Sequence, residues 1–397
     1  MRKLIILIGM VLFLAAASAP AYSQGKISVE GAKLPRIIGV ATSGVGGSGQ
    51  AQAVALASAM QDALGVPVRT MPAHAPAINL RQILAGSAQV QAGGCSQETI
   101  TDALMGVDIY ANQDWGPQDV GLVWYMYDAS TALMVRNDSS IKSFADLKGK
   151  KFAIYYAAPA YVRGIKGCLA FGNLTLDDMA LVEVGSYGDC VKAVADGRAD
   201  VAHVFGHSPV VYEAAESPHG IRFLAMSHSD KEAWARYFSH CPFRDKMIGK
   251  VCVPQMEGLE VANTPYVMWT HMNVSEDLVY LMTKVIVERY NSYKDQHPTF
   301  VFMSLNRMRE FMRSGLGIPV HPGTVRYLKE IGEWNEADES WNNRVKAGHE
   351  KRIQAWDAAV NEALPKRIAV SYTNKAWLEI WNKHRAGTPG LVRRDME

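Results

Sequence analysis

The sequence predicts an α/β fold in two lobes, followed by a helical C-terminal extension. From Pro35 onward, short apolar runs alternate with helix-like patterns, which is typical of a parallel sheet with helices on its faces. This alternation occurs twice, on either side of a long strand-like run at 120–139. From about Glu333 the chain becomes charged and rich in tryptophan, and its 397 residues exceed what one hydrophobic core usually organises.

The first unit reads as three strands, each followed by a helix. The expected strands are "RIIGVAT" (36–42), "VPVRTMP" (66–72) and "AQVQAG" (88–93). The expected helices are Gln50–Leu64 before Gly65, Ala77–Ala85 before Gly86, and Gln97–Leu104. This order predicts a parallel sheet for the first lobe.

The second unit repeats the pattern after the run at 120–139, which we expect to cross between lobes. Its expected strands are 151–156, 180–185, 199–205 and 222–227, and its expected helices are Val162–Phe171 and Tyr187–Ala195. After Val274 the pattern becomes helical, with Ser275 as the expected N-cap. The C-terminal extension reads as two or more amphipathic helices with Pro365 between them.

Residues 1–21 predict a cleavable secretory signal peptide. The basic residues Arg2 and Lys3 precede the almost wholly apolar run Leu4–Ala17, and an A-x-A motif places cleavage after Ala21. The alternative is an uncleaved anchor, but the apolar run is shorter than the roughly 20 residues that a helical span needs. We therefore expect an exported, periplasmic protein with no stable insertion in a membrane.

Charge and cysteine content narrow the possible partners. The chain has 41 Lys and Arg against 39 Asp and Glu, so electrostatics gives no argument for nucleic acid or an anionic membrane. No C-x-x-C pair is present, which disfavours a zinc ribbon or a thioredoxin-type site. Export permits disulfides, and two spacings allow them: Cys168 with Cys190, and Cys241 with Cys252. Cys95 is then left as a buried thiol or a site residue.

A glycine loop stands between the first expected strand and its helix. Gly44, Gly46 and Gly49 match G-x-G-x-x-G, but "VRTMPAHAP" (68–76) lacks the acidic residue that would hold a ribose. No Lys-Ser/Thr follows the glycines, which excludes a nucleotide-hydrolysing loop. Three interpretations remain: a helix start that binds a small anion, a tight turn that binds nothing, or a nicotinamide-nucleotide loop. We favour the small anion.

Several segments resemble a known family of receptors. "SSIKSFADLKGKKFAIYYAAP" (139–159) and "DGRADVAHVFGHSPVVYEAA" (196–215) resemble second-lobe segments of periplasmic solute-binding proteins. "KDQHPTF" (294–300) and "GIPVHPGTVRYLKEIG" (317–332) resemble the TAXI group of TRAP-transporter solute receptors. The loop "ATSGVGGSG" (41–49) matches the first-lobe loop of that group.

The resemblance covers about residues 36–332 and implies a type II clamshell. In this group, two α/β lobes joined by crossing strands close over a small carboxylate, such as an acidic amino acid or a 2-oxo acid, and dock on an ion-driven permease. The expected division is 36–128 for the first part of lobe one, 129–255 for lobe two, and 256–332 for the return to lobe one with hinge-bracing helices. We expect the extension at 333–397 to brace the lobes, with dimer or permease contacts as alternatives.

The departures from the family pattern lie in the expected pocket. "YYAAPAY" (155–161) replaces a glycine-rich loop, and "AHAPAINL" (73–80) replaces a Gly-Gly pair before Asn-Leu. Where Gln-Ser-Asp often ends the third strand, this chain has Gly94, Cys95 and Ser96. The pocket has been rebuilt, so the solute of the family does not transfer to this chain.

Ligands of such folds sit beyond the carboxyl ends of the strands, which selects a set of candidate ligand-binding residues. They are Thr42, Ser43, Gly44, Val45, His74, Asn79 and Cys95 from lobe one, and Tyr156, Tyr161, Arg163 and His207 from lobe two.

Each candidate has a structural alternative. Arg163 is the first candidate for a carboxylate clamp because its guanidinium binds with two hydrogen bonds, and the alternative is a surface arginine. His74 and His207 would hydrogen-bond the ligand or serve the fold. Tyr156 and Tyr161 would stack on the ligand or pack at a lobe edge. The remaining side-chain amide, Asn79, would donate to the ligand or simply open a helix.

No motif of catalysis is present in the sequence. It has no G-x-S-x-G and no H-E-x-x-H, and its histidines lack the spacing of metal ligands. We expect a binding protein and not an enzyme, without cofactor or metal, whose partners are a small organic acid or amino-acid-like ligand and the membrane subunits of a TRAP permease. The alternatives are a solute sensor without transport and an NAD(P)-dependent oxidoreductase that uses the glycine loop at 44–49.

Overall fold

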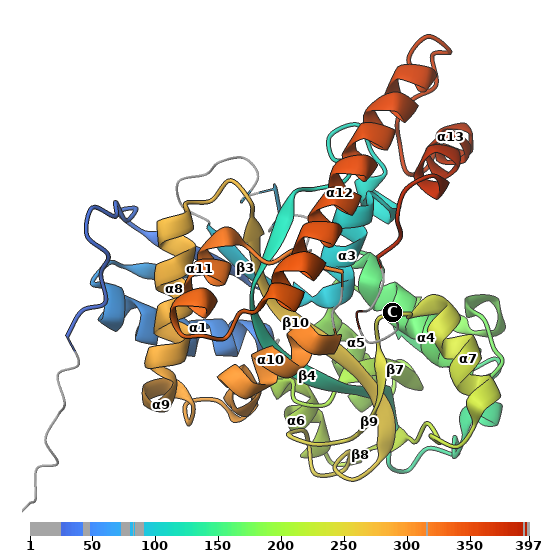
Figure 1. Cartoon of the computed structure of the whole chain (residues 1–397). Helices are drawn as coiled ribbons and strands as arrows, with labels where there is room; N and C mark the ends of the chain where they lie inside the picture. The colour runs from blue at the N-terminus through green and yellow to red at the C-terminus, as the bar shows by residue number, and fades with distance from the viewer. Residues whose placement is uncertain are drawn as a thin grey trace, which may run out of the picture.

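One mixed β-sheet runs through both halves of the molecule (Figure 1). The computed structural model describes residues 25–42, 48–72, 80–81, 83, 91–314, 317–391 and 394. The strands within these residues are β1 (Ile38–Thr42), β2 (Val68–Pro72), β3 (Ala92–Ser96), β4 (Val120–Arg136), β5 (Lys151–Ile154), β6 (Ala180–Glu183), β7 (Val201–Phe205), β8 (Ile221–Leu224), β9 (Asp245–Ile248) and β10 (Glu260–His271).

Helices cover the sheet and form the C-terminal extension. They are α1 (Ser48–Leu64), α3 (Gln97–Met105), α4 (Pro159–Phe171), α5 (Tyr187–Ala195), α6 (Pro209–Ala215), α7 (Lys231–His240), α8 (Glu276–Glu288), α9 (Tyr290–Tyr293), α10 (Leu305–Ser314), α11 (Pro322–Glu330), α12 (Glu336–Ala363) and α13 (Lys375–Ala386). Short 3-10 helices are η1 (Asp108–Tyr110), η2 (Phe144–Leu147), η3 (Leu176–Asp178) and η4 (Pro298–Met303).

The two halves of the sheet have the same strand pattern. In the first half β2, β1 and β3 are parallel, and β10 then pairs antiparallel with both β3 and β4. In the second half β6, β5 and β7 are parallel, and β4 pairs antiparallel with both β7 and β8. Each half carries its own hydrophobic core: one built from residues up to 129 and from 267 onward, the other from 132–262. The predicted α/β fold in two lobes is confirmed.

Two long strands connect the lobes. β4 is buried at every position but its last, and its Val-, Tyr- and Trp-rich sequence suits a strand that helices cover on both faces. It pairs with β10 from Val120 opposite His271 to Thr131 opposite Ala262. Among the described residues, the chain passes from one core to the other only within these two strands. The run at 120–139 is therefore the crossing strand that the sequence predicts.

The third strand lies further along the chain than expected. The sequence favours 88–93, whereas β3 spans Ala92–Ser96. These bounds follow the pairing with β10, in which Trp269 lies opposite Gly93 and Tyr266 lies opposite Ser96. The helix predicted over 77–85 falls largely outside the described residues.

The C-terminal extension is a helical hairpin that rests on the first lobe. In Figure 1, α12 projects away from the sheet and α13 folds back beside it. Trp356 lies edge-on to Trp377 and to Trp381, with ring centroids 5.0 Å apart in both pairs. The indole N–H of Trp377 donates to the carbonyl of Ala111 (3.0 Å), and that of Trp381 donates to the carbonyl of Gly106 (2.8 Å). The extension thus braces the segment that follows α3.

Neither of the two disulfides that the cysteine spacings allow is present. Cys95, Cys168, Cys190, Cys241 and Cys252 are all free and buried. Each thiol packs as a small apolar group: Cys241, for example, lies against α4, where its thiol donates to the carbonyl of Arg163 at 3.5 Å. Burial raises the pKa of all five thiols, so they stay protonated at neutral pH.

The predicted signal peptide is not described by the structure, since residues 1–24 lie outside the described ranges. Within those ranges, no helix is both long and apolar enough to span a bilayer.

Candidate functional site

The carboxyl ends of β3 and β7, one parallel strand from each lobe, meet at the crossing strands. Ser96, at the end of β3, lies opposite Tyr266 of β10. Tyr266 stacks on Tyr127 of β4, with ring centroids 4.5 Å apart and an interplanar angle of 12°. Phe205, which ends β7 in the second lobe, meets the Tyr266 ring edge-on at 5.9 Å. We call this junction the seam: Tyr127, Phe205, His207 and Tyr266, with Tyr187 behind Phe205, and with Cys95 and Gln97 on either side of Ser96 at the end of β3.

Aromatic rings form the greater part of the seam. Tyr187 packs against Phe205 at 5.4 Å, and its hydroxyl accepts the backbone N–H of Phe205 and donates to the Ser208 hydroxyl. His207 lies edge-on to Tyr127 at 4.8 Å. Burial raises the pKa of Tyr266 and Tyr187, so both phenols remain neutral hydrogen-bonding groups. Such a surface suits the flat or apolar body of a small molecule.

Two polar side chains in the seam are buried with unused hydrogen-bonding capacity. Gln97, the first residue of α3, is fully buried, and neither amide atom of its side chain has a partner among the described residues. Nε2 of His207 is likewise buried without a partner there. Burial lowers the pKa of His207 to about 3, so the ring is neutral. Unpaired buried polar atoms are costly, so these two side chains are candidates for hydrogen bonds to a solute.

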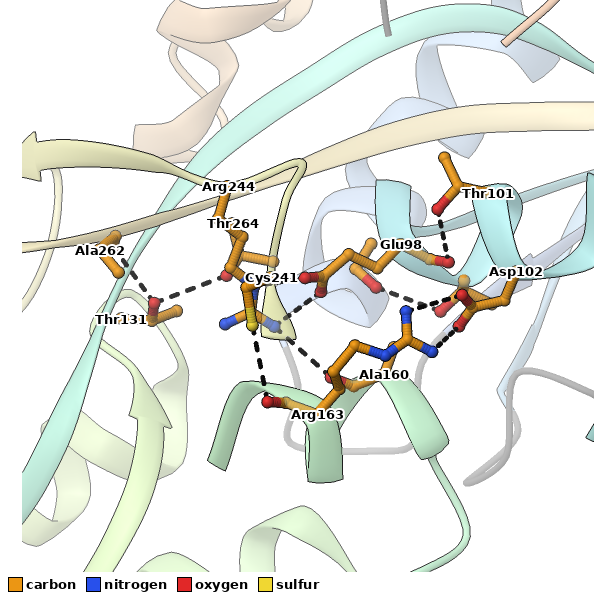
Figure 2. Close-up of polar contacts among 12 residues, drawn as sticks. Glu98, Thr101, Asp102, Thr131, Ala160, Arg163, Cys241, Arg244, Ala262 and Thr264 are labelled. Carbon is orange, nitrogen blue, oxygen red and sulfur yellow. Dashed lines mark hydrogen bonds and ion pairs between the residues drawn. The ribbon is translucent and has the colours of Figure 1, made fainter. Parts of the chain in front are cut away.

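Charged groups between the lobes are already paired within the chain (Figure 2). Arg163 of α4 makes two 2.7 Å hydrogen bonds to the carboxylate of Asp102 and also contacts Asp108. Arg244 makes two 2.7 Å hydrogen bonds to the carboxylate of Glu98. Burial raises the pKa of Asp102 to about 7, against the opposing effect of Arg163. In this arrangement both arginines are therefore hydrogen-bonded to carboxylates of the chain itself.

The structure places the candidates of lobe one at strand ends where it describes them. Thr42 is buried at the end of β1, and Cys95 is buried in β3 beside the indole of Trp269. Five of the candidates lie outside the described residues: Ser43, Gly44, Val45, His74 and Asn79.

The candidates of lobe two divide into different environments. His207 belongs to the seam, whereas Tyr156 is half exposed after β5. Tyr161 is buried in the core of the second lobe, where its hydroxyl donates to the carbonyl of His203 at 2.7 Å. This matches the packing alternative for that tyrosine. Arg163 is neither a free clamp nor a simple surface arginine, because Asp102 and Asp108 hold it against the first lobe. Its role in binding a ligand stays a prediction.

Part of the seam was not predicted from the sequence. Tyr127 and Tyr266 belong to crossing strands, which the rule of strand ends does not select. Gln97 could have been found, since it directly follows the third strand and opens a helix. Among the described residues no cluster of three or more His, Cys, Asp or Glu side chains could hold a metal ion.

A family model decides the relationship of this chain to known proteins. The model of the NMT1-like family matches residues 40–332, close to three quarters of the sequence. The chain belongs to the NMT1-like family. The matched region contains both lobes and ends before α12, so the C-terminal hairpin of this NMT1-like chain lies beyond the family match.

Solved structures of solute-binding proteins resemble it at low identity. A substrate-binding protein of an amino acid ABC transporter is 14% identical over 66% of this chain and 96% of its own, with a TM-score of 0.41. The alkanesulfonate-binding protein of Xanthomonas axonopodis pv. citri, bound to MOPS, is 14% identical over 85% and 95%, also at 0.41. An ancestral arginine-binding protein bound to arginine is 13% identical over 68% and 99%, at 0.42. Similarity at this level assigns no ligand to this chain.

Proposed function

We propose that this protein is a periplasmic solute-binding receptor that captures a small organic acid between its lobes and delivers it to a TRAP-type secondary transporter. The observation that carries the proposal is the seam, where neutral polar side chains with unused hydrogen bonds lie among aromatic rings between two lobes. Two crossing strands are the only described covalent links between those lobes, which suits closure around a ligand.

The groups of the seam favour a particular kind of solute. Stacked Tyr127 and Tyr266 suit a flat or apolar body, and the amide of Gln97 and the neutral imidazole of His207 suit hydrogen-bonding groups. A carboxylate would then be held by backbone N–H groups at the start of α1, where the helix dipole favours negative charge. We therefore propose a carboxylate that carries an aromatic or bulky apolar portion.

A thermal-shift screen tests this function. The panel contains dicarboxylates, acidic amino acids, 2-oxo acids, aromatic acids and nicotinamide cofactors. A ligand at 100 times its Kd stabilises the folded state by about 2.7 kcal/mol, so one acid class should raise the melting temperature by several degrees. If no acid raises the melting temperature, the proposal is contradicted. If only a nicotinamide cofactor raises it, the oxidoreductase alternative is favoured.

Matched variants localise the response. Gln97→Leu removes the unpaired amide of the seam and should abolish most of the shift. Gln52→Leu makes the same change at a fully buried glutamine that bonds to Thr299, within lobe one. That control should lower the melting temperature without solute but keep the shift. Equal loss of the shift in both variants contradicts a role for the seam.

Delivery and export have separate tests. For delivery, we expect genes for one large and one small permease subunit beside this gene, and a receptor that acts as a sensor would lack them. For export, N-terminal sequencing of the mature protein should begin at Tyr22, after the predicted cleavage site.

A further inference from the structure

Two arginines of the second lobe hold one helix of the first lobe by its carboxylates (Figure 2). Arg244 donates from Nε to Oε1 of Glu98 and from Nη2 to Oε2, both at 2.7 Å. Arg163 donates from Nη1 to Oδ1 of Asp102 and from Nη2 to Oδ2, again at 2.7 Å. Helix α3 packs in the first hydrophobic core, whereas α4 and the segment around Arg244 pack in the second. Both pairs therefore bridge the lobes.

The spacing on α3 explains why both pairs face the same partner lobe. Glu98 and Asp102 are four residues apart, so they lie one turn apart on one face of the helix. Each carboxylate meets a planar guanidinium with two parallel hydrogen bonds, the strongest geometry for this kind of pair. A rotation of one lobe away from the other would break four hydrogen bonds at once.

The Arg244–Glu98 pair is almost fully shielded from water, and the Arg163–Asp102 pair is largely so. The side chains of Glu98 and Arg244 are 2% and 1% exposed, and those of Asp102 and Arg163 are 6% and 21% exposed. A buried charge is tolerated only while its partner is present, because an unpaired charge in the interior is strongly unfavourable. If one partner is removed, the closed arrangement keeps the other charge buried and unpaired, which raises its free energy. Separation of the lobes would expose that charge to water, so the open arrangement becomes more favourable.

The sequence of α4 makes room for this contact. A Cβ on Gly164 would come within 2.7 Å of Nη2 of Arg244. The missing side chain lets the guanidinium cross α4 and reach Glu98, with further contacts to the hydroxyl of Tyr237 (3.4 Å) and the carbonyl of Ala160 (3.5 Å). Arg244 is thus positioned by its own lobe before it meets the other.

We propose that these two pairs, Arg244–Glu98 and Arg163–Asp102, form an interlobe latch that sets the equilibrium between closed and open lobes. The inference rests on the proposed function in one respect, namely that the lobes open and close. The latch makes closure favourable through contacts that are separate from the seam, so it tunes the apparent affinity for a solute by changing the fraction of chains in the closed form. In this proposal Arg163 stabilises the closed arrangement of the lobes and does not bind the solute.

Small-angle X-ray scattering of the mature, full-length protein in buffer tests the latch without any solute. The wild-type curve should match the closed arrangement. The double variant Glu98→Gln and Asp102→Asn should show a larger radius of gyration, because loss of both charges lowers the closed-to-open ratio at least about tenfold. Scattering identical to the wild type overturns the proposal.

A matched control separates the latch from general damage. Asp338 pairs with Arg394 at 2.6 Å, and the two side chains are 10% and 20% exposed, close to the values for Asp102 and Arg163. Asp338 lies in α12, within the C-terminal hairpin, so Asp338→Asn removes a similar pair that does not join the lobes. Its scattering should be that of the wild type. Expansion in this control equal to that of the latch variant overturns the assignment.

A charge reversal keeps the test decisive if the neutral variant unfolds. Arg163→Asp places a third carboxylate beside Asp102 and Asp108 and should expand the protein. Adding Asp102→Arg restores the opposite charges and should return the scattering to the compact curve, with helical circular dichroism unchanged throughout. Failure of the reversal to restore compactness contradicts the latch. If no acid in the thermal-shift screen raised the melting temperature, the proposed solute would be contradicted, but these scattering results would still test the latch.

Discussion

At the scale of single residues, the buried thiols make a direct prediction. Each of the five cysteines is buried, and burial raises the pKa of Cys168, Cys190 and Cys241 to about 12 and that of Cys252 to about 11. We expect no reaction of the native protein with a water-soluble thiol reagent and reaction of five thiols after denaturation without reductant. A count below five in the denatured protein would reveal a disulfide and contradict the structure.

Gly164 supplies a second residue-scale prediction. Alanine normally favours a helix over glycine by about 1 kcal/mol. At this position the added Cβ would displace the guanidinium of Arg244 from Glu98, so we expect Gly164→Ala to lower the free energy of unfolding by about 1–3 kcal/mol. Urea denaturation followed by circular dichroism measures it.

Gly348 of α12 is the control for this substitution. The nearest atom to its added Cβ would be Cβ of Pro389 at 3.5 Å, an ordinary contact. Gly348→Ala should leave the urea midpoint unchanged or raise it, because only the helix propensity changes. The steric explanation fails if both glycine variants move the midpoint in the same direction.

At the scale of elements, two buried indoles, those of Trp377 and Trp381, anchor α13 to the first lobe. Trp377 is fully buried, and its N–H donates to the carbonyl of Ala111. Trp377→Ala removes both the packing and the hydrogen bond, at a cost of about 3–5 kcal/mol, so α13 should detach from the first lobe. Limited proteolysis should then cut within 364–374 while the two lobes stay intact.

Tyr372 provides the comparison on the same hairpin. Its side chain is 45% exposed, so Tyr372→Ala removes an aromatic ring without opening the tryptophan cluster. The digestion pattern of this variant should equal that of the wild type. Faster cleavage in Tyr372→Ala than in Trp377→Ala would show that the turn itself, and not the indole anchor, protects the hairpin.

Elements with strong local signals could be predicted from the sequence, and elements defined by distant partners could not. The helix at Tyr187–Ala195 has the predicted bounds, because Ser186 caps it and accepts the N–H of Asp189. β10 received no prediction, since Pro265 interrupts a run that otherwise reads as a strand. In the structure, the pairing of β10 shifts register next to that proline, between Tyr266 and Val267.

The sequence predicted where the candidate site lies better than it predicted which residues form it. The rule of strand ends selected Cys95 and His207, which both lie at the junction of the lobes, and their binding of a ligand stays a prediction. The partner of Arg163 was not predictable, because Asp102 lies 61 residues earlier and meets it only when the lobes meet. A rule based on the ends of parallel strands does not select side chains within the crossing strands, such as Tyr266.

At the scale of the whole molecule, buried histidines make stability depend on pH. Burial lowers the pKa of His207 to about 3 and that of His321 and His349 to about 4, and the pKa of His203 lies well below 6.5. These rings stay neutral in the folded chain, whereas the unfolded chain takes up protons below pH 6.5. The free energy of unfolding should therefore fall between about pH 6.5 and 4, by on the order of 1 kcal/mol per pH unit for each histidine.

Asp102 acts in the opposite direction over the same range. Burial raises its pKa to about 7, so the folded chain binds this proton before the unfolded chain does and gains stability as the pH falls. Because four histidines oppose one carboxyl, the urea midpoint should still drop on acidification, and more steeply in Asp102→Asn. A midpoint that stays flat or rises between pH 7 and 4.5 contradicts this balance.

The two crossing strands also make the second lobe an insertion within the first. Thr131, where the chain enters that lobe, lies opposite Ala262, where the chain leaves it. The two ends of the inserted segment are thus neighbours, and the first halves of β4 and β10 would form an ordinary antiparallel hairpin if a tight turn replaced the segment. A single genetic event at that point can add, remove or exchange the whole second lobe while the first keeps its strand order. The architecture therefore allows the two lobes to change independently of each other during evolution.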